Sequence, residues 1–368
     1  MVERTGLGTN ERYFRLKIAF INDTHAGVRN SSDIFTDNAD LFYSDVFFPY
    51  LRDKGIKRII HLGDVFDNRK FINFKSLHRF RKSFLSKLRE YGMHMDVIPG
   101  NHDTFYKNTN ELNSLKELLG HYMGEVTIHM EPTVLDVNGF KLALLPWICP
   151  ENYERSMEFI NTCKADWLGG HLELIGFDVL RGVASHGGLN HSIFSRFEKV
   201  LSGHFHVSSQ KDNIHYLGTQ LEFSWADAGD EKGFHIFDTE TRELTKIVNP
   251  YTLFERIVYD DSKVDYSIYD TSKLDGKFVK VIVINKSDLF TFDRFIDRIQ
   301  LQKIHELKIA ENFNEFMGEN VEDEGVSVED TTELLDSYVD AVDTDLDKDR
   351  LKLNMRRLLI EAQALEIA

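Results

Sequence analysis

The fold prediction starts from the stretch Leu16–His25, LKIAFINDTH, in which an apolar run passes directly into an Asp-x-His pair. The run LKIAFI is typical of a buried β-strand. Similar β-rich runs recur up to a predicted hairpin at Gly233–Val248: Lys57–Leu62, His94–Pro99, Lys141–Pro146, Ala165–Gly170, Lys199–Gly203 and Asp212–Gly218. Apolar residues at helical spacing over Asn73–Tyr91 separate two of these runs. Strands that alternate with helices predict an α/β layered domain.

A different pattern follows Pro250. Lys277–Asn285 is typical of a strand, Phe290–Gln300 of an amphipathic helix and Lys303–Ala310 of a second strand, which together predict a small β-α-β domain. Apolar residues then recur at helical spacing over Arg350–Ala368. That helix either packs on the chain's own body or binds a partner protein, and its place beyond an acidic stretch favours the partner. The predicted parts are residues 1–245, residues 250–312, an acidic linker at 313–348 and a helix at 349–368.

The net charge of −16 is concentrated in one segment. Between Glu311 and Asp349, fifteen acidic residues and one basic residue account for −14, which leaves −2 for the rest of the chain. Such a segment is typical of a solvated linker. The nearly neutral remainder can still bind an anionic polymer through local basic residues, so the overall charge does not exclude a nucleic-acid enzyme.

Composition excludes several other classes of protein. No apolar run approaches the about 18 residues of a membrane span, and the first residues lack the apolar segment of a signal peptide. The two cysteines, Cys149 and Cys163, carry no disulfide-framework spacing. We therefore expect a protein of a reducing compartment, the cytoplasm, with no membrane partner.

Five short polar motifs lie at or just after the carboxyl ends of predicted strands, where ligands collect in open α/β sheets. They are Asp23–His25, Gly63–Asp67, Gly100–Asp103, Gly170–Glu173 and Gly203–His206. Each supplies Asp, Asn or His, whose oxygen and nitrogen atoms bind Mn, Fe, Zn or Mg ions. Any one of these motifs is more often a turn or a pair of structural histidines, but five in this arrangement predict a metal site.

The candidate ligands are too many for one ion and are about right for two ions bridged by one carboxylate. They are Asp23, His25, Asp64, Asn101, His171, His204 and His206. Two metal ions can activate a water molecule and stabilise a phosphate under attack, so the pattern predicts phosphoester hydrolysis. His102, next to one ligand, is the candidate acid that protonates the leaving oxygen.

In this order the motifs DTH, GDVFD, GNHD, GHLE and GHFH resemble those of the calcineurin-like metallophosphoesterases. They are most similar to SbcD-type DNA repair nuclease subunits, and LLPWICPEN (Leu144–Asn152) and LGTQLEFSW are similar to segments of tailed-phage recombination exonuclease subunits. The resemblance implies a four-layer α-β-β-α sandwich with a small α+β capping domain and a C-terminal helical tail. It also implies a homodimer that acts on double-stranded DNA ends with an SbcC-like ABC ATPase, in the bacterial host of a phage.

Carried over by motif, the resemblance implies two Mn²⁺ ions per chain, with Mg²⁺ as the alternative. Asp23, His25, Asp64 and His206 would hold the first ion, and Asp64, Asn101, His171 and His204 the second. His102 would be the catalytic histidine and Asp103 its support. Because the chain contains no G-x-x-x-x-G-K-[ST] loop, ATP is expected to bind the partner.

Two alternatives remain open at this stage. One is a phosphoprotein phosphatase or cyclic-nucleotide phosphodiesterase on the same fold, and the other is a non-catalytic clamp on DNA ends with structural metals. Some side chains also keep open roles. Asp67 stands where some relatives carry histidine, and His186 and His191 either line a substrate groove or are structural. Arg69 and Lys70 either meet DNA phosphates or lie in a solvated loop.

Overall fold

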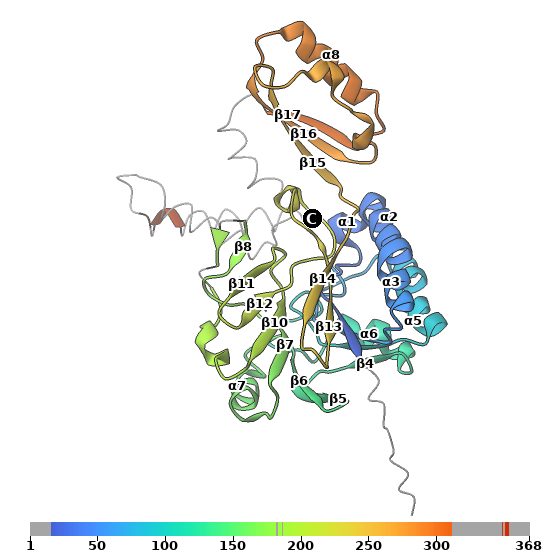
Figure 1. Ribbon diagram of the computed structural model, residues 1–368. Coiled ribbons are helices and arrows are strands. Elements are labelled where there is room, and N and C mark those ends of the chain that lie inside the picture. The colour runs from blue at the N-terminus through green and yellow to red at the C-terminus, as the bar shows by residue number, and fades with distance from the viewer. Residues whose placement is uncertain (1–15, 182, 186, 311–347, 349, 353–368) are drawn as a thin grey trace, which may run out of the picture. The chain divides into compact units, whose positions relative to one another are not determined.

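The computed structural model describes residues 16–181, 183–185, 187–310, 348 and 350–352 (Figure 1). The chain divides into two compact units, Met1–Phe316 and Met317–Ala368, and nearly all the described residues belong to the first. Most of the predicted acidic linker (313–348), most of the predicted partner-binding helix (349–368) and His186 lie outside the described residues. Among the residues that are described, no helix is long and apolar enough to span a membrane.

The first of two large sheets contains the strand that opens the fold. Its strands, in spatial order, are β14 (Leu244–Val248), β13 (Gly233–Asp238), β1 (Lys17–Ile21), β2 (Arg58–His61), β3 (His94–Val97) and β4 (Val126–Ile128). Strands β1 to β4 run parallel, whereas β13 is antiparallel to both of its neighbours. The carboxyl ends of β1, β2 and β3 therefore meet at one edge of the sheet.

The second large sheet is also mixed. Its strands, in spatial order, are β11 (Ser209–Lys211), β12 (Ile214–Tyr216), β10 (Lys199–Gly203), β7 (Trp167–His171), β6 (Phe140–Leu145) and β5 (Thr133–Val137). Strands β12, β10, β7 and β6 are parallel, and the two edge strands are antiparallel. A separate two-stranded ribbon joins β8 (Asp178–Leu180) to β9 (Val183–Ala184).

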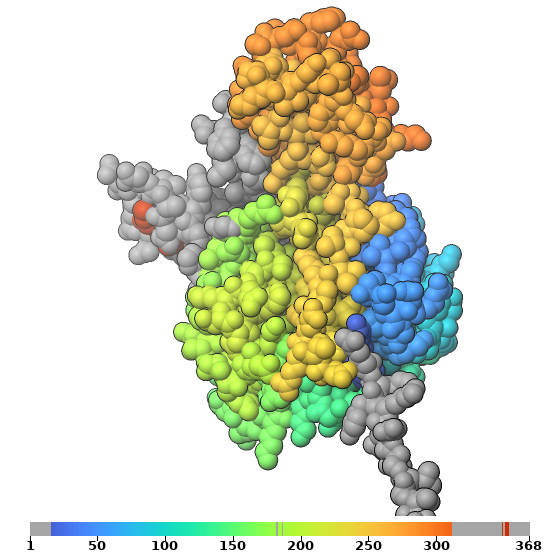
Figure 2. Space-filling view, viewed as in Figure 1, coloured from blue at the N-terminus to red at the C-terminus, as the bar shows by residue number. Residues whose placement is uncertain are grey.

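The two sheets pack face to face, with helices outside them. Side chains of β1 alternate between two cores, as the two-residue period of a strand requires. Ile18 and Phe20 enter the core between the sheets, where they meet Leu142 and Leu144 of β6, whereas Ile21 enters the core under the outer helices. The predicted four-layer α/β sandwich is confirmed. In Figure 2 the yellow β13–β14 hairpin runs between the blue helical side and the green side of the second sheet.

Helices cover the outer face of each large sheet. On the first sheet they are α1 (Val28–Ser31), α2 (Asp33–Leu41), η1 (Phe42–Phe47), α3 (Phe48–Asp53), α4 (Phe74–Phe80), η2 (Arg81–Leu85), α5 (Ser86–Tyr91) and α6 (Ser114–Leu119). On the second they are α7 (Tyr153–Thr162) and the 3₁₀ turn η4 (His191–Phe194). The predicted helix at Asn73–Tyr91 is confirmed: Asn73 caps it, and a π-helical turn, η2, lies within it.

A third sheet, with its own core, follows the hairpin. Its parallel strands are β15 (Phe254–Asp260), β16 (Phe278–Asn285) and β17 (Glu306–Ala310), and its helix is α8 (Leu289–Gln300). The apolar face predicted for the helix is buried, with Phe292, Phe295 and Ile299 in the core. Asp288 caps the helix by accepting hydrogen bonds from two backbone amides. Strand β15 was not predicted from the sequence.

Candidate metal centre

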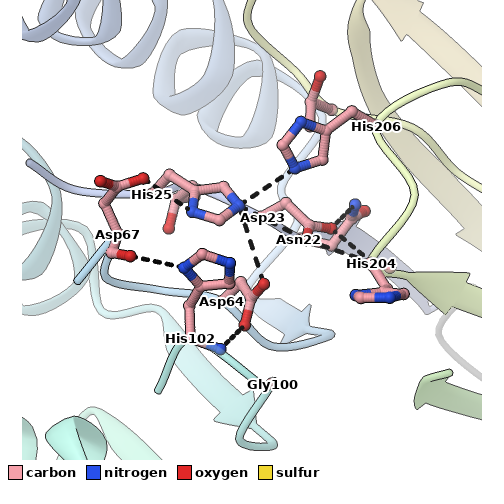
Figure 3. A network of polar contacts seen from close by, with 12 residues as sticks. Asn22, Asp23, His25, Asp64, Asp67, Gly100, His102, His204 and His206 are labelled. Carbon is pink, nitrogen blue, oxygen red and sulfur yellow. Dashed lines mark hydrogen bonds and ion pairs between the residues drawn. The ribbon is translucent and has the colours of Figure 1, made fainter. Parts of the chain in front are cut away.

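The five polar motifs lie together because their strands end at the same place in the sandwich. The loop after β1 pairs with the loop after β2: Asp23 N donates to Gly63 O at 2.9 Å, and His25 N donates to Asp64 O at 3.1 Å. Four residues of these loops and of the loop after β10 have left-handed backbones, with φ of 47° at Asp23, 42° at His25, 55° at Asp64 and 86° at His204. These conformations turn the polar side chains toward one another (Figure 3).

Two glycines allow the loops to approach closely. A Cβ on Gly100 would lie 2.2 Å from Asp64 Oδ1, and a Cβ on Gly63 would lie 2.6 Å from His171 Nδ1. Gly63 also has φ of 90°, which other residues rarely adopt. The sequence-based expectation that the motif glycines permit close backbone approach is confirmed at both positions.

The first cluster consists of Asp23, His25 and His206, whose ligand atoms lie within 4.8 Å of one another. His25 Nε2 is 3.2 Å from His206 Nε2 and 3.8 Å from Asp23 Oδ1. The Asp23 carboxylate also accepts hydrogen bonds from Asn22 Nδ2 at 2.5 Å and from His204 N at 3.1 Å. Asp23 and His25 are buried, so the cluster is largely withdrawn from solvent.

The second cluster consists of Asp64, His171 and His204, with Asn101 among them. The Asn101 Oδ1 atom lies 2.9 Å from His171 Nε2 and 3.0 Å from His204 Nδ1. Asp64 Oδ2 is 3.3 Å from His171 Nε2 and 3.8 Å from His25 Nε2 of the first cluster. Asp64 is therefore the side chain that lies between the two clusters.

The family model for the calcineurin-like phosphoesterases matches residues 16–208, which is more than half of the chain. Exonuclease subunit 1 of Enterobacteria phage T4 is 32% identical over 351 residues, which cover 94% of this chain and 99% of that protein. The chain belongs to the calcineurin-like phosphoesterase family. The family resemblance inferred from the motifs is thus confirmed, and the chain is a hydrolase of phosphate esters.

Solved structures with similarity to this phosphoesterase include two enzymes. An archaeal phosphodiesterase has 17% sequence identity and a TM-score of 0.34, over 64% of this chain and all of the other. A purple acid phosphatase from yellow lupin (Lupinus luteus) seeds has 10% identity and a TM-score of 0.38, over 63% of this chain and 52% of the other.

The donor atoms of the phosphoesterase site suit a divalent cation. Carboxylate oxygens and imidazole nitrogens are the protein ligands that Mn, Fe and Zn ions accept. In the cluster the His25 and His206 Nε2 atoms face each other at 3.2 Å, and two further imidazoles face the single Oδ1 of Asn101. Lone pairs that converge in this way are best satisfied by a cation, so the family and the clusters together support divalent metal binding.

The electrostatics of the site place protons where a cation would otherwise supply the charge. Burial lowers the pKa of His25, but the neighbouring carboxylates of Asp67 and Asp64 outweigh burial and raise it to about 9. For His171, burial is outweighed by Asp64, and the pKa is also about 9. Burial and the nearby charge of His171 lower the pKa of His204 to about 3, so this imidazole stays neutral and keeps a lone pair on one ring nitrogen.

His102 lies beside both clusters and is oriented by its Nδ1 atom. Nδ1 is 2.6 Å from the carbonyl oxygen of Asp67, so Nδ1–H donates there and Nε2 is turned away from that contact. The backbone N of His102 donates to Asp64 Oδ1 at 2.8 Å, and its ring lies 5.0 Å from that of His25. The Asp67 carboxylate itself is 3.4 Å from His25 Nδ1, which leaves Nε2 of His25 directed to the cluster.

Asp103 is fully buried and contacts backbone rather than the two clusters. Its Oδ2 accepts hydrogen bonds from Asp64 N at 2.8 Å and from Gly100 N at 2.9 Å. Its Oδ1 accepts from Val65 N at 3.0 Å and from Phe66 N at 3.3 Å. Burial and the charge of Asp64 raise the pKa of Asp103 to about 7. Asp103 therefore joins the GNHD loop to the GDVFD loop.

Several residues of the site were not predicted from the sequence. The Trp147 ring, which comes from the LLPWICPEN segment, lies 5.3 Å from that of His204. The Phe223 ring lies 5.5 Å from His25 and 5.6 Å from His206. Gln220 Nε2 donates to the backbone oxygen of Asp23 at 3.1 Å. Gln220 and Phe223 lie in the phage-like segment LGTQLEFSW, so the sequence pointed to this segment but not to the contacts of the two side chains.

The other candidates lie apart from the clusters. His191 Nε2 is 3.4 Å from Asp212 Oδ2, at the start of η4. Arg69 is half-buried and Lys70 is exposed, in the loop between Asp67 and α4. The part of these two basic residues in substrate binding stays a prediction.

Proposed function

We propose that this phosphoesterase is a Mn²⁺-dependent DNA nuclease, the exonuclease subunit of a complex for DNA recombination and double-strand-break repair. The observation that carries the proposal is the pair of clusters joined by Asp64, in a chain related over 94% of its length to a phage exonuclease subunit. The donor set supports two ions. Asp23, His25, Asp64 and His206 would hold one of them.

The second ion would be held by Asp64, Asn101, His171 and His204. When bound, such ions lower the pKa of a water molecule and stabilise the charge that builds on the phosphate. The chain's own part is to fix these ligands and to exclude bulk water by burying them. Most of them are buried within the sandwich, which supports this role.

His102 is proposed as the catalytic acid. Because its Nδ1–H is held by the Asp67 carbonyl, the proton available for transfer is on Nε2 of the imidazolium. That proton would pass to the leaving oxygen of the cleaved phosphodiester, which avoids expulsion of an alkoxide. Asp103 and Asp67 are proposed as positioning residues, since the first supports the loops of Asp64 and Asn101 and the second orients His25 and His102.

The proposal also covers parts of the chain outside the described residues and the partners of the chain. We assign 1–245 to the nuclease domain, 250–312 to a capping domain that contacts DNA, 313–348 to a linker and 349–368 to a helix that binds an SbcC-like ABC ATPase. We further propose a homodimer that acts on double-stranded DNA ends in a phage-infected bacterial cytoplasm. The relationship to one subunit of a phage exonuclease supports a partner and a DNA substrate.

The experiment is cleavage of end-labelled linear duplex DNA by the full chain with Mn²⁺, with and without the ATPase and ATP. We expect His102→Ala to reduce the rate by about 10²- to 10⁴-fold, the usual contribution of a general acid. Asp64→Ala should reduce cleavage to background. Wild-type protein that cuts DNA no faster than these variants would contradict the proposal.

A second arm separates the alternatives with small substrates. Hydrolysis of a nitrophenyl phosphate monoester, without hydrolysis of the bis-ester or of DNA, would favour a phosphatase instead. Bound metal with no hydrolysis of any ester would favour a non-catalytic clamp.

A further inference from the structure

A buried ion pair lies just outside the first cluster, between Asp227 and Lys232. Lys232 Nζ is 2.5 Å from Asp227 Oδ1, and each side chain is only 3% exposed. Asp230 adds a second carboxylate 3.7 Å from the same ammonium group. Taking two charges out of water is costly unless further hydrogen bonds satisfy both groups, so the other contacts of this pair indicate what it does.

The lysine contacts the loop that carries the two histidines of the GHFH motif. Lys232 Nζ donates to the backbone oxygen of His206 at 3.0 Å, and Thr219 N donates to the same oxygen at 3.1 Å. The ammonium group therefore fixes the peptide that follows the His206 side chain. The backbone of His206, a candidate metal ligand, is thus fixed by Lys232, which lies 26 positions later in the chain.

The aspartate contacts the loop on the other side of the same cluster. Asp227 Oδ2 accepts hydrogen bonds from Phe223 N at 2.8 Å and from Ser224 N at 2.9 Å. The Phe223 ring packs against the rings of both His25 and His206. Asp227 thereby fixes the aromatic side chain that supports the two imidazoles.

Charge adds a second argument. A buried ammonium group close to a cation site repels the cation unless a carboxylate neutralises it, and Asp227 is the nearest such carboxylate. Replacement of the Asp227 carboxylate by an amide would leave the Lys232 charge beside His206 with only the more distant Asp230 carboxylate to balance it. The pair thus positions the residues around His206 and keeps the charge beside the first cluster balanced.

We propose that Asp227 and Lys232 form a positioning pair that holds His25 and His206 in the arrangement needed to bind one of the two ions. The inference rests on the metal site of the proposed function but not on its DNA substrate. Substitution of a residue that orients a metal ligand commonly lowers metal affinity by about 10- to 100-fold. The contacts of this pair are with the residues around the first cluster, so the second cluster, around Asn101 and His171, should keep its affinity.

The experiment is calorimetric titration of Mn²⁺ into the full chain after removal of metal with EDTA. His206→Ala identifies the binding step that depends on the first cluster. We expect Asp227→Asn to weaken that same step by about 10- to 100-fold and to leave the other step unchanged. Lys232→Met, which removes the buried charge together with the hydrogen bond to His206, should weaken the same step by a smaller factor.

Asp96→Asn is the matched control. Asp96 is also buried and ion-paired, with Arg58 at 2.8 Å and His129 at 2.8 Å, but it touches neither cluster. It should lower the thermal stability of the metal-free protein and leave both Mn²⁺ steps unchanged.

Wild-type affinities in both Asp227→Asn and Lys232→Met would overturn the inference, as would an equal loss at the two steps. A wild-type chain that binds no Mn²⁺ would overturn the proposed function and this inference together. Absence of DNA cleavage, with the step-selective loss observed, would overturn only the nuclease proposal.

Discussion

The two clusters of the metal centre are held in different ways. The second cluster depends on contacts within its own loops. The Asp103 carboxylate accepts hydrogen bonds from backbone amides of the GDVFD and GNHD loops, and Gly100 allows these two loops to approach closely. The first cluster depends on a distant segment, in which Phe223 and Lys232 support His25 and His206. One cluster is therefore fixed mainly by backbone, and the other mainly by long-range side-chain contacts.

The largest effect is expected from Gly100→Ala. The new Cβ would lie 2.2 Å from Asp64 Oδ1 and 2.6 Å from Asp64 N, so the loops must separate. Since a displacement of about 1 Å at reacting groups can cost about 100-fold in rate, kcat/KM for DNA should fall at least that far. Steady-state cleavage at saturating Mn²⁺ measures it. An unchanged kcat/KM would show that the second cluster tolerates backbone movement.

Asp103→Asn should have the next largest effect. Each oxygen of the Asp103 carboxylate accepts hydrogen bonds from two backbone N–H groups, whereas the asparagine side chain has only one oxygen. At least two buried N–H groups would therefore lose their acceptor, which should lower the unfolding free energy by about 3 kcal/mol. Urea denaturation of the metal-free protein at pH 8 measures the loss. A loss below that of the control Asp96→Asn would contradict the special position of Asp103 between the loops.

Glu222→Gln tests the segment that supports the first cluster, at a side chain that contacts the backbone of Leu253 and Phe254. The Glu222 carboxylate accepts from Leu253 N at 2.6 Å and Phe254 N at 2.9 Å, and burial raises its pKa from 4.5 to about 7. The folded state thus holds this proton more tightly than the unfolded chain does. The unfolding free energy should therefore fall as pH rises from about 4.5 to about 7.

The glutamine side chain does not ionise, so the variant should be more stable than wild type by about 3 kcal/mol at pH 8 and equal to it near pH 4.5. Unfolding curves across this pH range give the difference. Mn²⁺ affinity should not change, because Glu222 faces Leu253 and Phe254. A stability difference that does not vary with pH would refute the assignment.

The smallest effect is expected from His191→Ala. Its imidazole pairs with Asp212 and contacts neither cluster, so stability should change by no more than about 0.5 kcal/mol. Both Mn²⁺ binding steps should match those of the wild type. A selective loss at either step would place His191 closer to the site than the structure does.

The sequence predicted the parts of this fold whose signals are local. The β-run of Leu16–Ile21 and the helical spacing of Asn73–Tyr91 each depend on neighbours in the chain, and both predictions are confirmed. The motif residues could be gathered into one site because the carboxyl ends of parallel strands share an edge. The π-helical turns escaped prediction, since they depend on hydrogen-bond spacing rather than on apolar pattern.

The support for the first cluster could not be predicted from the sequence. Lys232 and Asp227 are ordinary charged residues in a stretch rich in Gly and Asp, which is typical of a loop. Their burial beside His206 exists only after the second sheet has packed on the first. Trp147 is a comparable case, because its contact with His204 joins two loops from different strands.

The left-handed backbones at Asp23, His25, Asp64 and His204 have a consequence for evolution and engineering. Such conformations cost non-glycine residues about 1–2 kcal/mol each, so the fold sacrifices part of its stability at its metal centre. Glycine at any of these four positions would relieve the strain while removing a donor atom. A selection for heat resistance alone would therefore erode the active centre before it altered the hydrophobic core.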